Sequence, residues 1–386
     1  MVAAAAGAPR ALGAAADRRA AIASLTLRLA PATPRRRHAV RDVTRGAAGD
    51  RGRGGRAAPP ARRPAGPAPP PGVRAKKALG QHFLADEGVL DDTLAAARLR
   101  PGDPVLEVGP GTGALTRRLL DAGALVAAVE KDDWLVERLA ANFADTPALR
   151  LVHGDVLRQD LPALADELAA WAAGVHGAGG DGIGAAAGVV ARVAAAPALP
   201  RVIANLPYNI TKEFLALALP LGGRLGSLLL MLQHEAAARL VQEKPGGAEW
   251  RAANIIVGYY AKPRYLFRVS RLKYAPPPAV DGAVVEFALR PPGERPAVPS
   301  ERRFLAVVKA AFSQKRKALR NSVRPAAAGA DVEAAIRAAG LDEGARAQEM
   351  SLDDFVRLSR AIEAGRPAAG GSGGGEAAPV VEPSDD

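Results

Sequence analysis

Short apolar runs alternate with amphipathic stretches through the middle of the chain. Apolar runs that end at polar residues or glycine predict buried strands, whereas apolar positions three and four residues apart predict helices. Predicted strands cover residues 105–109, 124–129, 149–152, 201–204 and 227–232. Helices are expected between them, including residues 112–121 and 132–143. This alternation predicts an α/β fold with a parallel sheet and crossover helices.

The pattern changes after the fifth predicted strand. Residues 265–272 and 283–289 are expected to close the sheet as an antiparallel pair. From residue 293 to 364 the pattern is helical with basic faces, which predicts a small helical domain after an α/β domain of residues 76–292. The Ala- and Gly-rich residues 163–200 match no strand pattern, so they are expected to form a surface insertion in the α/β domain.

The two ends of the chain differ from this middle part in composition. Residues 1–75 consist almost entirely of Ala, Arg, Pro and Gly, with too few large apolar side chains to form a core. Up to Lys77 there are 17 Lys and Arg against three acidic residues, which accounts for the net charge of +12 of the whole chain. We expect an organellar transit peptide; the alternative is a basic arm that stays attached and contacts RNA. The Gly-rich and acidic residues 365–386 are expected to be a solvated tail.

The composition excludes several kinds of site. The chain has no cysteine, so disulfides, thiolate zinc sites, iron–sulfur clusters and cysteine nucleophiles are excluded. Its five histidines show no paired ligand spacing, and no metal is expected. The longest apolar stretch, residues 215–232, is interrupted by Pro220 and Arg224, so no membrane span is expected either.

A glycine-rich turn follows the first predicted strand. From Glu107 to Gly113 the chain reads Glu-Val-Gly-Pro-Gly-Thr-Gly, and Gly109 and Gly111 allow the backbone to approach a ligand closely. Glu130, at the end of the second strand, has the spacing of a carboxylate that accepts hydrogen bonds from ribose hydroxyls. NAD and S-adenosylmethionine both contain such a ribose, so this spacing does not separate them. Capping of the following helix is the structural alternative for Glu130.

Two further acids favour S-adenosylmethionine over NAD. Glu107 directly precedes the glycines, where an acid suits the sulfonium and ammonium groups of S-adenosylmethionine better than a pyrophosphate. Asp155 follows Gly154 at the end of the third strand and could accept a hydrogen bond from the adenine amino group. An Asp after Gly is also a common turn residue, so this reading of Asp155 has a structural alternative.

The end of the fourth predicted strand carries the candidate reaction site. Asn205, Leu206, Pro207 and Tyr208 lie at the carboxyl edge of the sheet, where ligands of open α/β sheets bind. An exocyclic amine is a poor nucleophile because its lone pair is delocalised into the base. The Asn205 side-chain oxygen and the Leu206 carbonyl could accept its two hydrogens and so free the lone pair. Pro207 would fix the turn, and Tyr208 would stack on a flipped base.

Further motifs lie at residues 79–84, 205–210, 231–235, 274–281 and 312–321. In order and spacing, these motifs and the glycine turn, Glu130 and Asp155 resemble the ribosomal RNA adenine dimethyltransferase family. The resemblance extends from about residue 76 to 323 and implies a Rossmann-like class I S-adenosylmethionine methyltransferase sheet with a small C-terminal α-helical domain. Members of the family transfer methyl groups to N6 of two adjacent adenosines in a terminal stem-loop of small-subunit rRNA.

The resemblance also assigns roles to residues of this sequence. It implies that S-adenosylmethionine is the cofactor, held by Gln81, His82, Leu84, Glu107, Gly109, Gly111, Glu130, Asp155 and Asn205. It implies that the target adenine is held by Asn205, Leu206, Pro207, Tyr208 and Tyr274. Tyr274 would stack on the face opposite Tyr208. The sequence departs from the common pattern at His82, where many members have Asn, and at Tyr274, where Phe is frequent.

Other expectations concern partners, compartment and rival functions. Small-subunit rRNA is the implied partner of a monomeric enzyme. A basic cluster of Lys315, Arg316, Lys317 and Arg320, of which the last three share a helical face, is expected to contact its phosphates. A solvated helix face is the alternative for these four residues. Similarity to plastid members favours the chloroplast over the mitochondrion. Rival functions are an organellar transcription initiation factor of the same fold and an NAD-dependent oxidoreductase, for which no catalytic His, Lys or Tyr–Lys pair stands out.

Overall fold

The computed structural model describes residues 72–73, 75–76, 79–177, 198–247, 249–314 and 317–367. These residues form two compact units, the first ending at Arg295 and the second beginning at Pro296. The second unit also includes a short segment that begins at Pro245. The boundary expected from the sequence, between residues 292 and 293, lies close to the observed one. Most of the expected transit peptide and of the expected tail falls outside the described residues.

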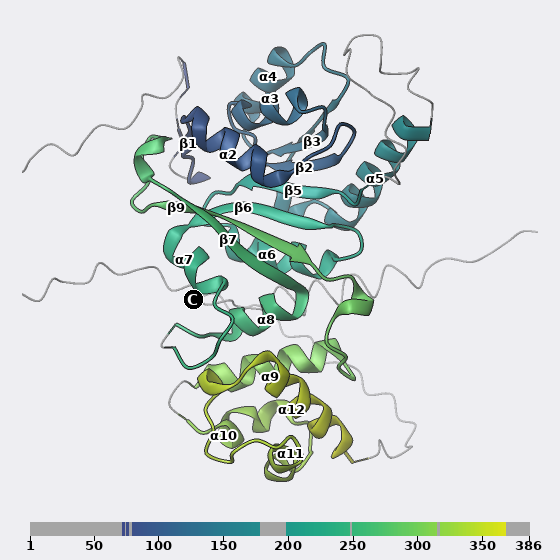
Figure 1. Ribbon diagram of the computed structural model, residues 1–386, viewed down its shortest axis with the longest axis vertical. Helices are drawn as coiled ribbons and strands as arrows, with labels where there is room; N and C mark the ends of the chain where they lie inside the picture. Colours follow the sequence, from purple (N-terminus) through teal and green to yellow (C-terminus); the bar gives the residue numbers. More distant parts are fainter. Residues whose placement is uncertain are drawn as a thin grey trace, which may run out of the picture. The chain divides into compact units, whose positions relative to one another are not determined.

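A seven-stranded sheet forms the centre of the first unit, with strand order β4-β3-β2-β5-β6-β9-β7 (Figure 1). Its strands are β2 (Pro104–Val108), β3 (Leu125–Glu130), β4 (Leu149–His153), β5 (Arg201–Asn205), β6 (Ser227–Gln233), β7 (Ala261–Val269) and β9 (Gly282–Leu289). Strands β2 to β6 are parallel, and β9 pairs antiparallel with both β6 and β7. The five predicted parallel strands and the antiparallel pair are therefore confirmed. A separate pair joins β1 (Phe83–Leu84) to β8 (Tyr274–Ala275).

The seventh strand ends earlier than the sequence predicts. Residues up to Leu272 were expected in the strand, but β7 ends at Val269 and Arg271–Lys273 form a 3-10 turn. The Ser270 hydroxyl accepts a hydrogen bond from the Leu272 N–H, and an Asp281 carboxylate oxygen accepts one from the Arg271 N–H. These bonds take the backbone donors that a continuing strand would need, so the chain leaves the sheet here.

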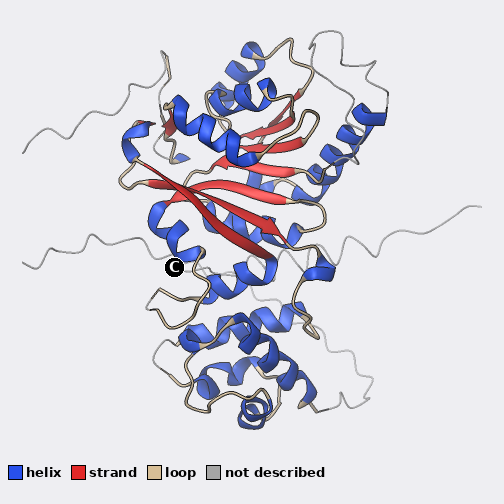
Figure 2. Cartoon of the chain, viewed as in Figure 1, coloured by secondary structure: helices blue, strands red, loops and turns tan. Residues whose placement is uncertain are grey.

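Helices lie on both faces of the sheet (Figure 2). In the first unit they are α2 (Glu87–Ala97), α3 (Ala114–Asp121), α4 (Asp133–Asn142), α5 (Leu161–Gly177), α6 (Thr211–Ala218), α7 (His234–Leu240) and α8 (Ala252–Tyr260). In the second unit they are α9 (Glu301–Ser313), α10 (Leu319–Val323), α11 (Val332–Ala338) and α12 (Leu352–Ala364). Leu90 of α2 and Leu119 of α3 join Val105, Val126 and Ile203 of the sheet in one buried cluster. Because helices cover both faces, the central strands are apolar on both sides, which explains their uninterrupted apolar runs.

The expected insertion at residues 163–200 begins later than predicted. Residues 161–177 form α5, whose side chains Leu161, Ala165, Leu168 and Ala172 are buried. Their spacing of three and four residues is that of a helix packed on one face. Alanine occupies both buried positions, such as Ala165 and Ala172, and exposed ones, such as Ala170 and Ala173, so the sequence pattern gave little contrast between the two sides. The rest of the expected insertion, residues 178–197, lies outside the described residues.

Among the residues described, no helix combines the length and apolarity needed to cross a bilayer. Within the same residues, no group of three or more His, Asp or Glu side chains is arranged to hold a metal ion.

Gly113, which caps the start of α3, makes a testable contribution to this fold. Its φ angle is 86°, and an added Cβ would lie 2.8 Å from Cε2 of Phe143 and 3.0 Å from Cδ2 of Leu139. We expect Gly113→Ala to lower the free energy of unfolding by about 3 kcal/mol, because it combines a left-handed backbone with a steric clash. Urea unfolding followed by circular dichroism measures this change.

Gly174 in α5 provides the matched control. Nothing lies within 4 Å of a Cβ added there, so Gly174→Ala should raise stability by about 0.5–1 kcal/mol through helix propensity. Equal stability of the two alanine variants would contradict the role given to Gly113.

Candidate functional site

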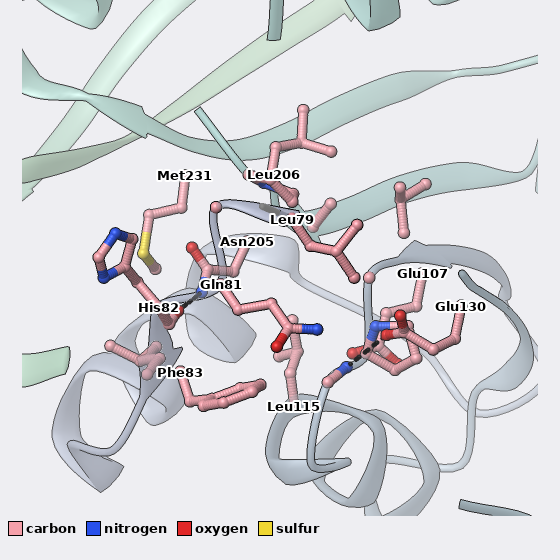
Figure 3. Close-up of a pocket in the computed structure, with 18 of the residues that line it drawn as sticks. Leu79, Gln81, His82, Phe83, Glu107, Leu115, Glu130, Asn205, Leu206 and Met231 are labelled. Atoms are coloured by element: carbon pink, nitrogen blue, oxygen red, sulfur yellow. Dashed lines mark hydrogen bonds between the residues drawn. The ribbon is translucent and has the colours of Figure 1, made fainter. Parts of the chain in front are cut away.

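A cavity of about 1430 Å³, counted with its open mouth, lies at the carboxyl ends of the parallel strands (Figure 3). It is lined by every residue that the sequence assigned to the cofactor or to the target base. These are Gln81, His82, Leu84, Glu107, Gly109, Gly111, Glu130, Asp155, Asn205, Leu206, Pro207, Tyr208 and Tyr274. Six segments distant in sequence therefore meet around one space. Four of them lie at the ends of β2, β3, β4 and β5, because the carboxyl ends of parallel strands share one edge of the sheet.

The glycine turn forms one wall of the cavity. Gly109 and Gly111 have φ angles of 67° and 58°, which favour glycine. A Cβ on Gly111 would lie 3.1 Å from the Phe83 ring, and one on Gly109 would lie 3.9 Å from Cδ of Pro207. The turn after β2 thus lies close both to the segment before α2 and to the loop after β5.

Glu130 is held by backbone N–H groups. Its Oε2 accepts a hydrogen bond from Gly111 at 3.1 Å, and its Oε1 accepts from Lys131 at 2.8 Å and Asp132 at 2.9 Å. The side chain is 6% exposed, and burial raises the pKa of Glu130 despite these bonds. Glu130 thus braces the turn that leads into α4, but the cap of this helix is Asp132, so the capping role considered for Glu130 is wrong. A carboxylate has about four acceptor positions, so about one is left for a ribose hydroxyl.

Glu107 lies inside β2 and is almost completely buried, with 1% exposure. Its Oε2 has no hydrogen-bond partner among the described residues. Burial raises the pKa of Glu107 to about 8, and the nearby Glu130 carboxylate adds to the effect. In the free protein at neutral pH this carboxyl group is therefore mostly protonated. An unpartnered acid that lines a cavity is suited to a ligand that carries positive charge.

Asp155 forms an ion pair and a turn. Its Oδ2 accepts a hydrogen bond from Lys131 Nζ at 2.9 Å, and its Oδ1 accepts from the Leu157 N–H at 3.0 Å. Burial alone would raise the pKa of Asp155, but these two hydrogen bonds outweigh it and lower the pKa. The turn-forming alternative for Asp155 is realised, and its contact with an adenine stays a prediction.

The amide of Asn205 has a defined orientation. Its Nδ2 donates to the main-chain carbonyl of His82 at 3.2 Å, and a carbonyl can only accept (Figure 3). The Nδ2 therefore faces His82, and the Oδ1 points away from it. The loop continues with Leu206, which is 1% exposed, and turns where the Pro207 carbonyl accepts from the Ile210 N–H. The Asn205 Oδ1, which is expected to contact the target amine, therefore takes no part in the hydrogen bond to His82.

The two candidate stacking residues both point toward Gly282 at the start of β9. A Cβ on Gly282 would lie 2.6 Å from the Tyr274 hydroxyl and 3.2 Å from that of Tyr208. The Tyr274 hydroxyl donates to the sulfur of Met231 at 2.6 Å, so the group that distinguishes Tyr from the common Phe has a partner. Burial raises the pKa of both tyrosines. Tyr274 is only 1% exposed, and its stacking on an adenine stays a prediction.

Sequence reasoning gave no role to Lys131 or Met231, which also line the cavity. Their positions could have indicated one. Lys131 directly follows the acid at the end of β3, and Met231 is paired with Asn205 between β5 and β6. Both lie at the strand edge where the other candidate residues were found.

The basic cluster of the second unit differs from the prediction. Lys315 and Arg316 lie outside the described residues, while Lys317 and Arg320 are exposed. The shared helical face is wrong for Lys317, because α9 ends at Ser313 and α10 begins only at Leu319. Leu319 is fully buried and its N–H donates to the Ala345 carbonyl, which fixes the start of a new helix. Phosphate contact by these side chains stays a prediction.

Known proteins resemble this chain over most of its length. Residues 72–364 match a family model described as ribosomal RNA adenine dimethylase. A chloroplastic ribosomal RNA small subunit methyltransferase from Arabidopsis thaliana is 36% identical over 289 residues, which cover 74% of this chain and 78% of the relative. Ribosomal RNA small subunit methyltransferase A from Pseudomonas fluorescens is 36% identical over 287 residues, covering 74% of this chain and 93% of the relative.

Two solved structures share the fold. A dimethyladenosine transferase from Plasmodium falciparum has a TM-score of 0.54 at 20% identity and covers 72% of this chain and 96% of that one. The 23S rRNA methyltransferase ErmE has a TM-score of 0.51 at 22% identity, and the match covers 73% of this chain and 99% of that one. The expected class I methyltransferase sheet with a small helical unit is therefore confirmed.

The buried carboxyl group of Glu107 should make stability depend on pH. Its pKa is about 8 in the folded protein against the usual 4.5. The contribution of the protonated carboxyl group to the free energy of unfolding is therefore fully present below about pH 4.5 and is lost as pH rises through about 8. We expect Glu107→Gln to match the wild type near pH 4.5 and to exceed its free energy of unfolding above pH 8. Urea unfolding at a series of pH values measures the difference.

Glu137→Gln, on an exposed part of α4, is the control, and it should follow the wild type throughout. A pH profile of Glu107→Gln that overlies the wild-type profile would contradict a buried, protonated Glu107.

Proposed function

The chain belongs to the ribosomal RNA adenine dimethylase family, and we propose that it transfers methyl groups from S-adenosylmethionine to N6 of two adjacent adenosines in small-subunit rRNA. One observation carries the proposal most directly. The same cavity brings the oriented Asn205 amide and the Tyr208 and Tyr274 rings together with the glycine turn and Glu130. A cofactor and a base in this cavity would lie side by side.

The residues of the cavity fit S-adenosylmethionine. Glu107 offers an unpartnered buried oxygen to a cationic ligand, and ionisation of Glu107 would be favoured by the positive charge. Glu130 has an acceptor position left for a ribose hydroxyl. Asp155 follows β4, and β4 and β5 lie on opposite sides of β2, the strand that leads into the glycine turn. When bound, the cofactor supplies a methyl group on a positively charged sulfur.

Asn205 and Leu206 prepare the target amine. The Asn205 Oδ1 and the Leu206 carbonyl oxygen accept the two amino hydrogens, which favours a pyramidal nitrogen with an available lone pair. Burial of Leu206 keeps water from competing for its carbonyl. The raised pKa values of Tyr208 and Tyr274 keep both phenols neutral, so these residues offer ring faces rather than bases. No titrating base is needed, because acceptor geometry activates the nitrogen.

The rival functions have less support. The relatives are described as methyltransferases, which favours catalysis over a purely transcriptional role. Membership of the dimethylase family likewise disfavours an NAD-dependent oxidoreductase. The relative from Arabidopsis thaliana is chloroplastic, so we propose the chloroplast as the compartment, with the mitochondrion as the alternative. Its name also supports small-subunit rRNA as the partner.

Asn205→Ala tests the proposed reaction. With labelled S-adenosylmethionine and immature small ribosomal subunits, the wild type should transfer methyl groups to adenosine N6. The variant should lose about 100-fold in the single-turnover rate, because it removes an acceptor used in the transition state. Asn142→Ala, an exposed position at the end of α4, is the control. Full activity of Asn205→Ala would refute the role assigned to the amide.

Lys317→Ala and Arg320→Ala test the contact with RNA. If each side chain neutralises one phosphate, each variant should weaken rRNA binding and reduce the slope of log affinity against log salt by about 1. The rate at saturating RNA should not change, since both residues lie outside the first unit. Arg337→Ala, at an exposed side chain of α11, is the control. An unchanged salt slope in both variants would assign the cluster to a solvated surface.

A further inference from the structure

The segment of residues 79–86, called the strap below, contributes to both halves of the cavity. On one side the ring of Phe83 packs with Val73 and Leu135 and lies against Gly111. On the other side Leu84 pairs with Tyr274 in the register of β1 and β8. The strap therefore contacts the glycine turn of the predicted cofactor site and a residue of the predicted target site.

A buried carboxylate holds the strap on the cofactor side. Gln81 Nε2 donates to Oδ2 of Asp132 at 2.9 Å, and Lys76 Nζ donates to Oδ1 at 2.7 Å. The Lys76 N–H also donates to Oε1 of Gln81 at 2.8 Å, so both ends of the Gln81 amide are engaged. Asp132 itself is 3% exposed. We call Asp132, Gln81 and Lys76 the clamp.

The clamp remains charged. Burial alone would raise the pKa of Asp132, but the hydrogen bonds from Lys76 and Gln81 outweigh it and lower the pKa. Asp132 also caps α4 through the Trp134 N–H, and its own N–H donates to Glu130. The carboxylate is thus fixed by the fold, whereas the side chains of Gln81 in the strap and of Lys76 just before it come to it.

The residue next to Gln81 holds the reaction site. The main-chain carbonyl of His82 accepts a hydrogen bond from the Asn205 side-chain amide, and the Nδ1 of His82 donates one to the Pro276 carbonyl at 2.7 Å. The two ends of an Asn amide are nearly equal in size, and rotation about its last torsion is broad and two-fold. In the described part of the chain, the hydrogen bond to the His82 carbonyl distinguishes the productive orientation from one that would present an NH₂ group to the target amine.

We propose that Asp132 is a positioning residue for methyl transfer: through Gln81 and Lys76 it fixes the strap, and the His82 carbonyl then holds Asn205 with its oxygen toward the target. Figure 3 shows Gln81 extending across the cavity from the Asn205 side toward Glu107 and Glu130. The proposal rests on the proposed function for its effect on catalysis. Its structural part concerns the free protein alone.

Two variants loosen the clamp without altering Asp132, which α4 needs as a cap. Gln81→Met keeps the length of the side chain but removes both amide hydrogen bonds, and Lys76→Met keeps the stem but removes the charge. Arg224→Met is the matched control, because it breaks another ion pair, with Asp166, at a side chain of similar exposure (52% against 53% for Lys76).

The first readout is the side-chain amide of Asn205 in the free protein, followed by ¹⁵N NMR. In the wild type and in Arg224→Met its hydrogens should exchange slowly with solvent, because one is bonded to His82. In Gln81→Met and Lys76→Met exchange should be at least about tenfold faster, which corresponds to about 1.4 kcal/mol of lost protection. Unchanged exchange in both clamp variants would overturn the proposal.

The second readout is methyl transfer. The single-turnover rate at saturating cofactor and RNA should fall about tenfold in Gln81→Met, since small misplacements of a positioned group lower the rate strongly. In an Asn205→Ala background, Gln81→Met should cause no further fall, because the path through the amide is already lost. A further tenfold fall there would overturn the route through Asn205. If the wild type transfers no methyl group to RNA, the proposed function fails, and the NMR readout still decides whether the clamp orients Asn205.

Discussion

The central strands of the sheet are buried on both faces, so nearly all of its polar chemistry stands at the strand ends. All residues of β2 and β3 are buried, and polar side chains gather where these strands and β5 meet the cavity. A polar group placed further inside would need a partner or would lose its charge. Glu107 is the exception that illustrates the rule. It lies within β2, finds no partner for one oxygen, and holds its proton to about pH 8.

Three of the acids near this edge, Glu107, Glu130 and Asp132, lie in surroundings that give each a different state. The burial of Glu107 is opposed only by the Thr116 hydroxyl, whereas Glu130 is buried but accepts three backbone hydrogen bonds. Asp132 is equally buried, yet a lysine and an amide donor keep it ionised. The site therefore concentrates acidic groups without concentrating negative charge, because the least compensated acid remains neutral until a cation arrives. Such an arrangement suits a cofactor whose positive charge is lost when it becomes product.

Features fixed by neighbouring residues could be predicted from the sequence, and features fixed by distant ones could not. Apolar runs gave the strands, and the polar residues after them gave the site, because strand direction alone brings those ends together. Helix α5 was missed since alanine gives little contrast between its two sides. The helical face expected for Lys317 and Arg320 fails because burial of Leu319 starts a new helix. The clamp joins Lys76 to Asp132, and nothing in the local pattern of either residue indicates the other.

The strap shows why a reaction motif is not sufficient by itself. Asn205 to Tyr208 contains every group expected at the target amine, but the motif does not determine which end of the Asn205 amide faces the base. That choice depends on one carbonyl, at His82, in a segment 123 residues earlier in the chain. The carbonyl is in place because Gln81 reaches Asp132 on one side and His82 reaches Pro276 on the other. Since Asp132 also donates its N–H to Glu130, the turn expected to bind the ribose is the same turn that anchors the strap. The predicted cofactor site and the predicted target site are thus joined through a short covalent and hydrogen-bonded path, and the role proposed for Asn205 depends on that path as much as on the motif.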